Sequence, residues 1–339
     1  MRTPTFQQCI SSDFEQPLNI HNNFTKRIRA SPDGLCVLVS SADMKIRLYE
    51  TPPSSSSSSS ILESETTTES NNIKITESMA SDINNNTIPE PTAIYTTHEG
   101  GCVYDMEWNP LMNSNNPSSC FYTTAVQGHP IHLYDAYSGH FCASYRPYND
   151  LDELDSTFSI TFSADGSKII SGHERCIRIF DTQSPGRTYS TRKLTSTRKS
   201  KRGQKGIIAS LDCNPDHSGL FAAGSYNGTT CLYAESSPEE LMQIQGHDGC
   251  GITQVQFSKD GTFLFTAARN DYYINCWDIR NTSECIMQYK RNAKTNQRIG
   301  FDLQNDGKVI CTGNKEAKMM FYNVQSGQLL HTMTDFPGT

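Results

Sequence analysis

Four residues in one stretch of the chain have the types and spacing of a buried hydrogen-bond network. His247, Thr266, Asp271 and Trp277 lie within GHDGCGITQVQFSKDGTFLFTAARNDYYINCWD, residues 246–278. Imidazole, hydroxyl, carboxylate and indole groups can satisfy one another when buried, and buried polar groups need such partners. The chemistry that they predict is structural, because such a network locks one four-stranded sheet of a repeat protein. We expect His247 to be a hydrogen-bonding residue and not a catalyst.

Motifs of catalysis and cofactor binding are absent from the sequence. It contains no G-x-S-x-G elbow, no G-x-x-x-x-G-K phosphate loop and no H-E-x-x-H pair. His129 and His132 are the closest histidines, but no nearby cysteine or carboxylate cluster completes a metal set. We therefore predict a protein that is not an enzyme, with no catalytic residues, no metal and no cofactor.

Cations, amides and tyrosines gather in and after the same stretch. The combination could hold single-stranded RNA, whose bases stack on aromatic rings and offer their edges to polar groups. The alternative is that these residues are charges at strand ends that face water. The candidate residues are Arg269, Lys290, Arg291, Lys294, Asn296, Gln297 and Arg298, with Tyr272, Tyr273 and Tyr289 beside them.

A second basic segment covers residues 192–205, with seven cations and no acid. Its centre, RKSKR, contains Arg198, Lys199, Lys201 and Arg202. Lysine and arginine at this density attract phosphate backbones without reading sequence, and the same run could serve as a nuclear-import signal. A solvated connecting loop is the third interpretation, and the sequence leaves all three open.

A repeat organises the chain that must position these residues. Aromatic residues mark a third strand in each copy, at Tyr49, Tyr134, Phe180, Tyr233, Trp277 and Tyr322. The intervals are 85, 46, 53, 44 and 45 residues, against about 40–45 for one propeller blade. The first excess disappears without residues 51–92, a segment rich in Ser, Asn and Thr with a net charge of −5. We expect that segment to be a disordered loop of unknown role.

Asp-Gly turns and alternating apolar runs predict strands throughout and no long amphipathic helix. The fold class is all-β, a β-propeller with six visible repeats. The sequence divides into an N-terminal segment (1–23) that could supply an outer strand closing the ring, blade 1 (24–50), the insertion (51–92), blades 2–6 (93–331) and the start of a further blade (332–339). After Tyr322 only 17 residues remain. Either six blades close the ring or most of a seventh is missing, and we favour the second interpretation.

Composition narrows the class of protein further. The net charge of −7 gives no global sign of nucleic-acid binding. No apolar run is long enough to span a membrane, and the N-terminus has no signal-peptide core. The 12 cysteines show no C-x-x-C spacing, so we expect reduced thiols in the cytosol or nucleus.

Several specific segments of the sequence, beyond the repeat itself, resemble one family. The matching segments appear in order as SADMKIRLYETPP (41–53), HPIHLYDAYSG (129–139), YNDLDEL (148–154), GIIASLDCNP (206–215), AAGSYNGTTCLYA (222–234), GHDGCGIT (246–253) and TNQRIGFDL (295–303). Together they resemble the telomerase Cajal body protein family of WD-repeat proteins. YNDLDEL and TNQRI are not generic features of a WD40 blade, so the resemblance is specific.

The resemblance implies a seven-bladed WD40 propeller that recognises the CAB box of small Cajal-body RNAs of the H/ACA class and of telomerase RNA. It implies delivery of these particles to Cajal bodies in the nucleus, in support of telomere maintenance. The implied partners are H/ACA ribonucleoprotein proteins such as dyskerin, coilin and SMN-type Cajal-body proteins, and the cytosolic chaperonin during folding.

Given the family, we expect Arg269, Lys294, Asn296, Gln297 and Arg298 to contribute to an RNA-facing surface. Tyr148 and Asn149 would belong to a family-specific loop on that surface or beside a partner protein. The rival interpretation is a WD40 adaptor that docks proteins only, as a ligase, chromatin or DNA-repair scaffold. Sequence alone leaves both open.

Overall fold

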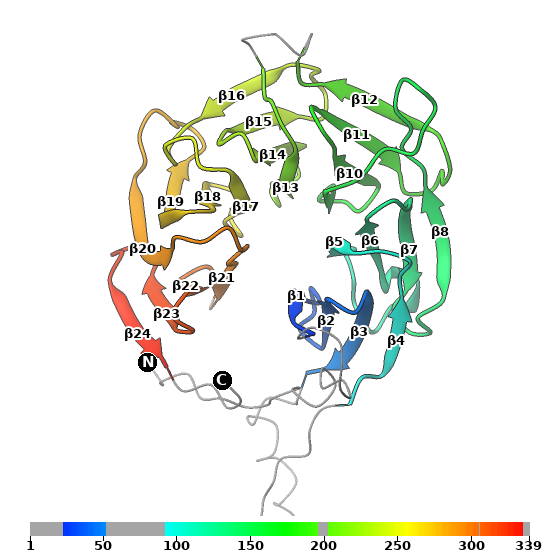
Figure 1. Ribbon diagram of the computed structural model, residues 1–339, viewed down its shortest axis with the longest axis horizontal. Helices are drawn as coiled ribbons and strands as arrows, with labels where there is room; N and C mark the ends of the chain where they lie inside the picture. Colours follow the sequence, from blue (N-terminus) through cyan, green and yellow to red (C-terminus); the bar gives the residue numbers. More distant parts are fainter. Residues whose placement is uncertain (1–22, 52–91, 196–202, 305, 335–339) are drawn as a thin grey trace, which may run out of the picture.

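Six antiparallel sheets of four strands each form the described part of the chain. The computed structural model describes residues 23–51, 92–195, 203–304 and 306–334. In each sheet every strand pairs with its neighbour in sequence. The sheets stand side by side around a central opening, with the first strand of each sheet innermost and the fourth outermost (Figure 1). The predicted all-β propeller is confirmed.

The first three blades extend from Thr25 to Lys193. Blade 1 contains β1 (Thr25–Ala30), β2 (Cys36–Ser41), β3 (Lys45–Glu50) and β4 (Tyr95–His98). Blade 2 contains β5 (Val103–Trp108), β6 (Phe121–Val126), β7 (Ile131–Asp135) and β8 (Phe141–Tyr145), with the short 3-10 helix η3 (Pro117–Ser119) before β6. Blade 3 contains β9 (Ser159–Phe162), β10 (Lys168–Gly172), β11 (Cys176–Asp181) and β12 (Tyr189–Lys193).

The other three blades follow the same order. Blade 4 contains β13 (Ile208–Cys213), β14 (Leu220–Ser225), β15 (Thr230–Ala234) and β16 (Glu240–Ile244). Blade 5 contains β17 (Ile252–Phe257), β18 (Phe263–Ala268), β19 (Asp271–Asp278) and β20 (Met287–Ala293). Blade 6 contains β21 (Phe301–Gln304), β22 (Val309–Gly313), β23 (Met319–Asn323) and β24 (Leu329–Met333).

The repeated turn between the first and second strands follows from its sequence. In blades 3 and 5 a serine hydroxyl donates to an aspartate two residues later, Ser163 to Asp165 at 2.6 Å and Ser258 to Asp260 at 2.5 Å. The glycine after that aspartate, Gly166 or Gly261, has a φ of 70° or 69°, a conformation that glycine adopts without steric cost. The Asp-Gly signals therefore correspond to real turns between strands.

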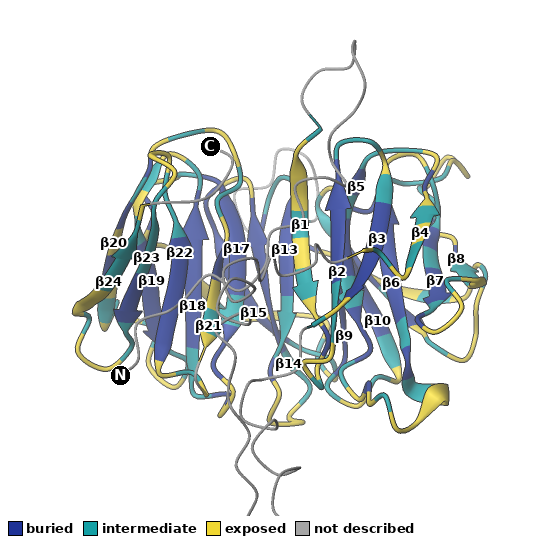
Figure 2. Ribbon diagram, turned by 90° about the horizontal axis from the view of Figure 1, so that it is seen from below, coloured by how far each residue is buried: buried dark blue, intermediate teal, exposed yellow. Residues whose placement is uncertain are grey.

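Apolar side chains fill the space between adjacent blades. All six aromatic markers lie on a third strand and are buried. Phe180 of blade 3, for example, packs with Ala125 and Ile131 of blade 2 in one cluster. Burial is densest in the inner and middle strands (Figure 2). Blades 2–5, which have a neighbour on each side, thus bury both faces of their middle strands, which is why those strands are apolar runs.

Polar side chains on the innermost strands join each blade to the next. We call these contacts the inner-strand links. Each one satisfies a backbone group or a charge that the central opening would otherwise leave without a partner. In ring order they are Arg27 Nε to Asp105 at 2.9 Å, Ile160 N to Asp105 at 3.2 Å, Ser159 Oγ to Ile208 O at 2.8 Å, Phe257 N to Asp212 at 2.6 Å and Gln254 Nε2 to Phe301 O at 2.7 Å.

Two expected boundaries differ from the structure. We expected blade 2 to begin at residue 93, but β4 pairs with β3 and completes blade 1. The insertion hides this strand, because it separates β4 from its partner in sequence. We expected blade 6 to end at residue 331, whereas β24 continues to Met333. Residues 1–22, most of the insertion and 335–339 lie outside the described residues. In the rest of the chain, no strand of blade 6 pairs with blade 1.

Candidate nucleic-acid interface

The network predicted in blade 5 is a set of mutual hydrogen bonds. His247 Nε2 lies 2.8 Å from the Thr266 hydroxyl, which also accepts from Trp277 Nε1 at 2.9 Å. His247 Nδ1 contacts the Asp271 carboxylate. Burial acts to raise the pKa of Asp271, but the hydrogen bond and the charge of His247 outweigh it and lower that pKa. Every polar group is used inside the blade, so the arrangement stabilises structure.

Other blades use different residues for the same purpose. In blade 2, Glu99 takes the place of the histidine and contacts Thr124 Oγ1 at 2.8 Å and His132 Nδ1 at 3.0 Å. In blade 4, Gln204 accepts from the Tyr233 hydroxyl at 3.0 Å. The sequence did not reveal these networks, because neither blade carries the Gly-His and Trp-Asp pairs of blade 5.

In blade 3 a fully buried histidine forms the corresponding hydrogen bonds. The imidazole of His173 contacts Ser171 Oγ at 2.9 Å and the carbonyl of Ser156 at 2.9 Å. Burial, followed by the charge of Arg178, lowers the pKa of His173 from 6.5 to about 3. The folded protein therefore holds this histidine neutral.

That pKa predicts a loss of stability in acid. As the pH falls below 6.5, the unfolded chain takes up a proton at residue 173 before the folded chain does. The free energy of unfolding should fall by up to about 1.4 kcal/mol per pH unit. Urea unfolding at several pH values checks this, with His173→Gln as the comparison. The variant should be less stable at neutral pH and less sensitive to acid. Equal pH dependence in both proteins would contradict the assignment.

The predicted RNA-facing residues mostly meet on one face of the ring. In an antiparallel blade, the segments joining the second to the third strand and those joining one blade to the next lie at the same end of the strands. We call this end the loop face. Arg269 lies after β18, and Lys294, Asn296, Gln297 and Arg298 lie between β20 and β21. All five therefore belong to the loop face.

Hydrogen bonds hold these two loops together. Asn270 N donates to the carbonyl of Thr295 at 3.0 Å, and Asn270 Nδ2 donates to Asn296 Oδ1 at 2.7 Å. Asn270 has a φ of 56°, a left-handed conformation that asparagine tolerates better than most residues. Gln297 is exposed, and its backbone N–H donates to Thr295 Oγ1 at 3.2 Å.

Tyrosine rings accompany the loop-face cations. The Arg269 guanidinium lies 3.8 Å from the centre of the Tyr226 ring, and Lys294 Nζ lies 5.8 Å from the Tyr272 ring. The two tyrosines are 39% and 41% exposed. Cations stacked on aromatic rings, and aromatic rings that remain exposed, are the groups to which single-stranded RNA binds. Sequence reasoning missed Tyr226, which belongs to another blade and stands 43 residues before Arg269.

Arg298 lies just before the inner strand β21. Burial lowers its pKa, Asp105 and Tyr226 oppose that change, and Arg29 adds to it. Its neighbours therefore come from blades 1, 2 and 4. Arg298 therefore lies at the part of the loop face nearest the inner strands.

Two of the predicted contacts are placed differently. Arg291 is only 1% exposed and donates to the carbonyl of Ile299 at 2.8 Å and to Thr312 Oγ1 at 3.1 Å. Burial lowers its pKa to about 10. It supports the 294–300 loop from beneath and cannot reach a phosphate, so we remove it from the candidate set. Lys290 is exposed but lies in the middle of the outermost strand β20, at the circumference of the ring.

Tyr148 and Asn149 lie in the segment between β8 and β9, which belongs to the loop face of blades 2 and 3, beside β12. Asn149 folds its own loop, because its Oδ1 accepts from the N–H groups of Leu151 and Glu153 at 2.9 and 3.0 Å. The backbone N–H of Tyr148 donates to the Tyr189 hydroxyl at 3.0 Å. The structure therefore does not bring these two residues together with Arg298.

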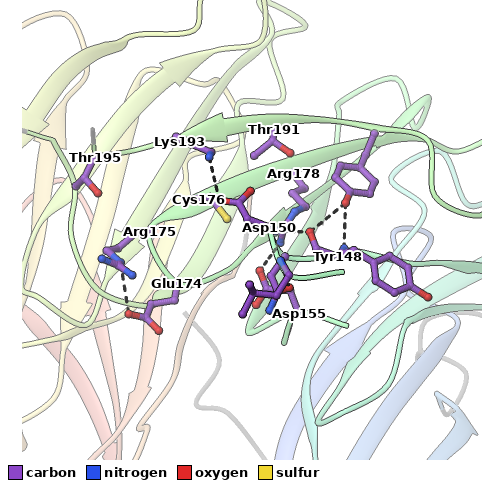
Figure 3. Close-up of a pocket in the computed structure, with 13 residues that line it drawn as sticks. Tyr148, Asp150, Asp155, Glu174, Arg175, Cys176, Arg178, Thr191, Lys193 and Thr195 are labelled. Atoms are coloured by element: carbon purple, nitrogen blue, oxygen red, sulfur yellow. Dashed lines mark hydrogen bonds and ion pairs between the residues drawn. The ribbon is translucent and has the colours of Figure 1, made fainter. Parts of the chain in front are cut away.

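An open groove of about 670 Å³ runs between this loop and the outer strands of blade 3 (Figure 3). Its cations already have acidic partners. The ion pairs are Arg178 with Asp155 at 2.6 Å, Lys193 with Asp150 at 3.2 Å and Arg175 with Glu174 at 3.4 Å. A charge-balanced groove attracts phosphate weakly, whereas Arg269 and Lys294 rest on tyrosine rings. The nucleic-acid candidate is thus the loop face of blades 4–6.

Some predictions fall elsewhere. Arg198, Lys199, Lys201 and Arg202 lie outside the described residues. Where the structure describes the chain, no group of three or more His, Cys, Asp and Glu side chains could hold a metal. Over the same ranges, no helix has the length and apolar character needed to cross a membrane.

The ring of four-stranded blades and the His-Thr-Asp-Trp network define a WD-repeat β-propeller, a scaffold class. Residues 238–278 match the model of the family "WD domain, G-beta repeat". The chain is 34% identical over 335 residues to telomerase Cajal body protein 1 of Rattus norvegicus, covering 97% of this chain and 58% of the relative. It is 35% identical over 292 residues to the Homo sapiens protein of that name, covering 86% and 48%.

A Drosophila melanogaster homolog with that name is 31% identical over 298 residues, covering 86% of this chain and 49% of the relative. The chain belongs to the telomerase Cajal body protein 1 family. It spans about half the length of the curated relatives that it matches.

Proposed function

We infer that this chain is a non-catalytic RNA-binding scaffold. It recognises the CAB box of small Cajal-body RNAs of the H/ACA class and of telomerase RNA, and directs these particles to Cajal bodies in support of telomere maintenance. The observation that carries the proposal is the loop face of blades 4–6, where Arg269 and Lys294 lie against Tyr226 and Tyr272. The names of the relatives connect those proteins with telomerase and the Cajal body.

The side chains of the loop face are suited to binding an RNA loop. Single-stranded loops have unstacked bases, which stack on aromatic side chains while their phosphates meet cations. The exposed amides of Asn296 and Gln297 stand in the same loop as Lys294 and Arg298. Amides offer donors and acceptors to base edges, so this loop supplies the groups that sequence recognition needs.

Partners and location follow from the same proposal. An H/ACA particle brings proteins such as dyskerin, and residence in a Cajal body brings coilin and SMN-type proteins. The chain would therefore work in the nucleus. Folding in the cytosol with the chaperonin suits an all-β ring in which every link between neighbouring blades joins residues distant in sequence.

Crosslinking in cells followed by sequencing of the recovered RNA tests this function. We expect enrichment of H/ACA RNAs over other structured RNAs of similar abundance. Recovery of proteins without such RNAs would instead favour the WD40 adaptor, and the RNA-binding proposal would then be wrong.

A further inference from the structure

Charged and aromatic residues of several blades lie at or near the loop-face ends of the inner strands. Arg27 and Tyr104 are near the start of the inner strands of blades 1 and 2, and Phe158 directly precedes the inner strand of blade 3. Tyr226 follows β14 of blade 4, and Arg298 lies before β21. We call these five residues, together with Arg269, the channel mouth. None of Arg27, Tyr104, Phe158 and Tyr226 was expected from the sequence to contact a ligand.

The residues of the channel mouth influence one another electrostatically. Arg298 feels the charges of Asp105 in blade 2 and Arg29 in blade 1, and also the Tyr226 phenol in blade 4. Burial raises the pKa of Tyr104, and Tyr226 adds to that effect from across the opening. Side chains from opposite parts of the ring are thus electrostatic neighbours.

Aromatic rings stand on two sides of the mouth. Tyr104 and Phe158 stack on each other with ring centres 5.4 Å apart and an angle of 29°. The Arg269 guanidinium lies 3.8 Å from the centre of the Tyr226 ring, and Tyr226 is still 39% exposed. Stacked aromatic and guanidinium planes form platforms for nucleobases, because every base has a π-face.

Charge changes sign along the channel. At the mouth Arg298 and Arg27 come close enough to lower the pKa of Arg27, in addition to burial and to Arg29. The Nη1 group of Arg27 has no hydrogen-bond partner within the described structure. Further along the inner strands are Glu107 and Asp212, and burial raises the pKa of Asp212 to about 7. Arg27 Nε already pairs with Asp105 at 2.9 Å, so Arg298 is the cation of the mouth that can attract a phosphate, and the carboxylates further along the strands repel it.

We propose that the channel mouth takes one unpaired nucleotide of the bound RNA loop. Its base stacks on the exposed part of the Tyr226 ring, and its phosphate pairs with Arg298. This inference rests on the proposed function and adds the place and the form in which the RNA is held.

An abasic scan of a CAB-box hairpin tests the proposal. The full chain is titrated against hairpins that each lack the base at one loop position, and binding is followed by fluorescence anisotropy. We expect one position at which loss of the base weakens binding on the order of 10-fold. In Tyr226→Leu the intact hairpin should bind more weakly by a similar factor, and the same abasic position should cause little further loss, because base and ring act as a pair.

Controls separate stacking from folding and from the proposed function. Tyr226→Phe keeps the ring and should bind as the wild type does, and Tyr137→Leu removes an exposed tyrosine (55% exposed) from the opposite face. Thermal unfolding shows whether Tyr226→Leu is folded. Wild-type affinity in Tyr226→Leu, or an abasic loss of equal size in both proteins, overturns this inference alone. No binding of the intact hairpin by the wild type overturns the proposed function as well.

Discussion

Replacing Lys294 and Arg298 together by alanine weakens binding of a CAB-box hairpin by about 10- to 100-fold at roughly physiological salt. Both residues lie in the segment between β20 and β21, which belongs to the loop face. Each phosphate neutralised on a single strand contributes about 0.7 to the slope of log affinity against log salt. Loss of two contacts should therefore reduce that slope by about 1.4. Anisotropy titrations over a range of salt concentrations measure both quantities.

A matched pair of lysines controls for net charge. Lys259 and Lys308 are exposed on the segments that join first and second strands, at the other end of the ring. Lys259→Ala with Lys308→Ala removes the same two charges and should leave affinity and slope close to wild type. Equal losses in both double variants would mean that binding follows overall charge, and the loop-face assignment would be discarded.

Replacing Asp105 by alanine destabilises the protein by about 3–5 kcal/mol. The Asp105 carboxylate is 1% exposed, lies 2.9 Å from Arg27 Nε, and accepts from the N–H groups of Met106 and Ile160 at 2.8 and 3.2 Å. Without it, a largely buried guanidinium and two buried N–H groups lose their partner at once. Urea unfolding of the wild type and the variant gives the difference in free energy.

Two comparisons show whether the inner-strand link is the cause. Asp105→Asn keeps an acceptor for the backbone and should lose less stability than Asp105→Ala. Asp306→Ala removes a carboxylate from an exposed ion pair with Lys259 and should leave the unfolding midpoint unchanged. If Asp105→Ala unfolds at the wild-type urea concentration, the inner-strand links do not hold the blades together.

The local parts of the fold could be predicted from the sequence. Third-strand aromatics such as Phe180 and Trp277 and turn glycines such as Gly261 act within one blade, so spacing along the chain reveals them. The fourth strand of blade 1 could not be placed, because the insertion separates β4 from β3. A short strand with no turn signal beside it cannot be recognised from the sequence pattern.

The candidate site was predictable only in part. The loop that carries Lys294 and Arg298 stands out by its cations and amides, but composition does not show which cation is buried. Arg291 belongs to the same run and supports the loop from inside. Tyr226 and Tyr104 come from blades that only ring geometry brings together, and a single sequence contains no record of that proximity.

The most direct test of the RNA-binding scaffold is the affinity of the purified chain for two hairpins that differ only in the CAB box. Both are titrated by anisotropy at about 0.15 M salt, where non-specific attraction is screened. We predict that the hairpin with the intact box binds at least about tenfold more tightly, a difference of roughly 1.4 kcal/mol. Equal affinity for the intact and the altered box would contradict the account.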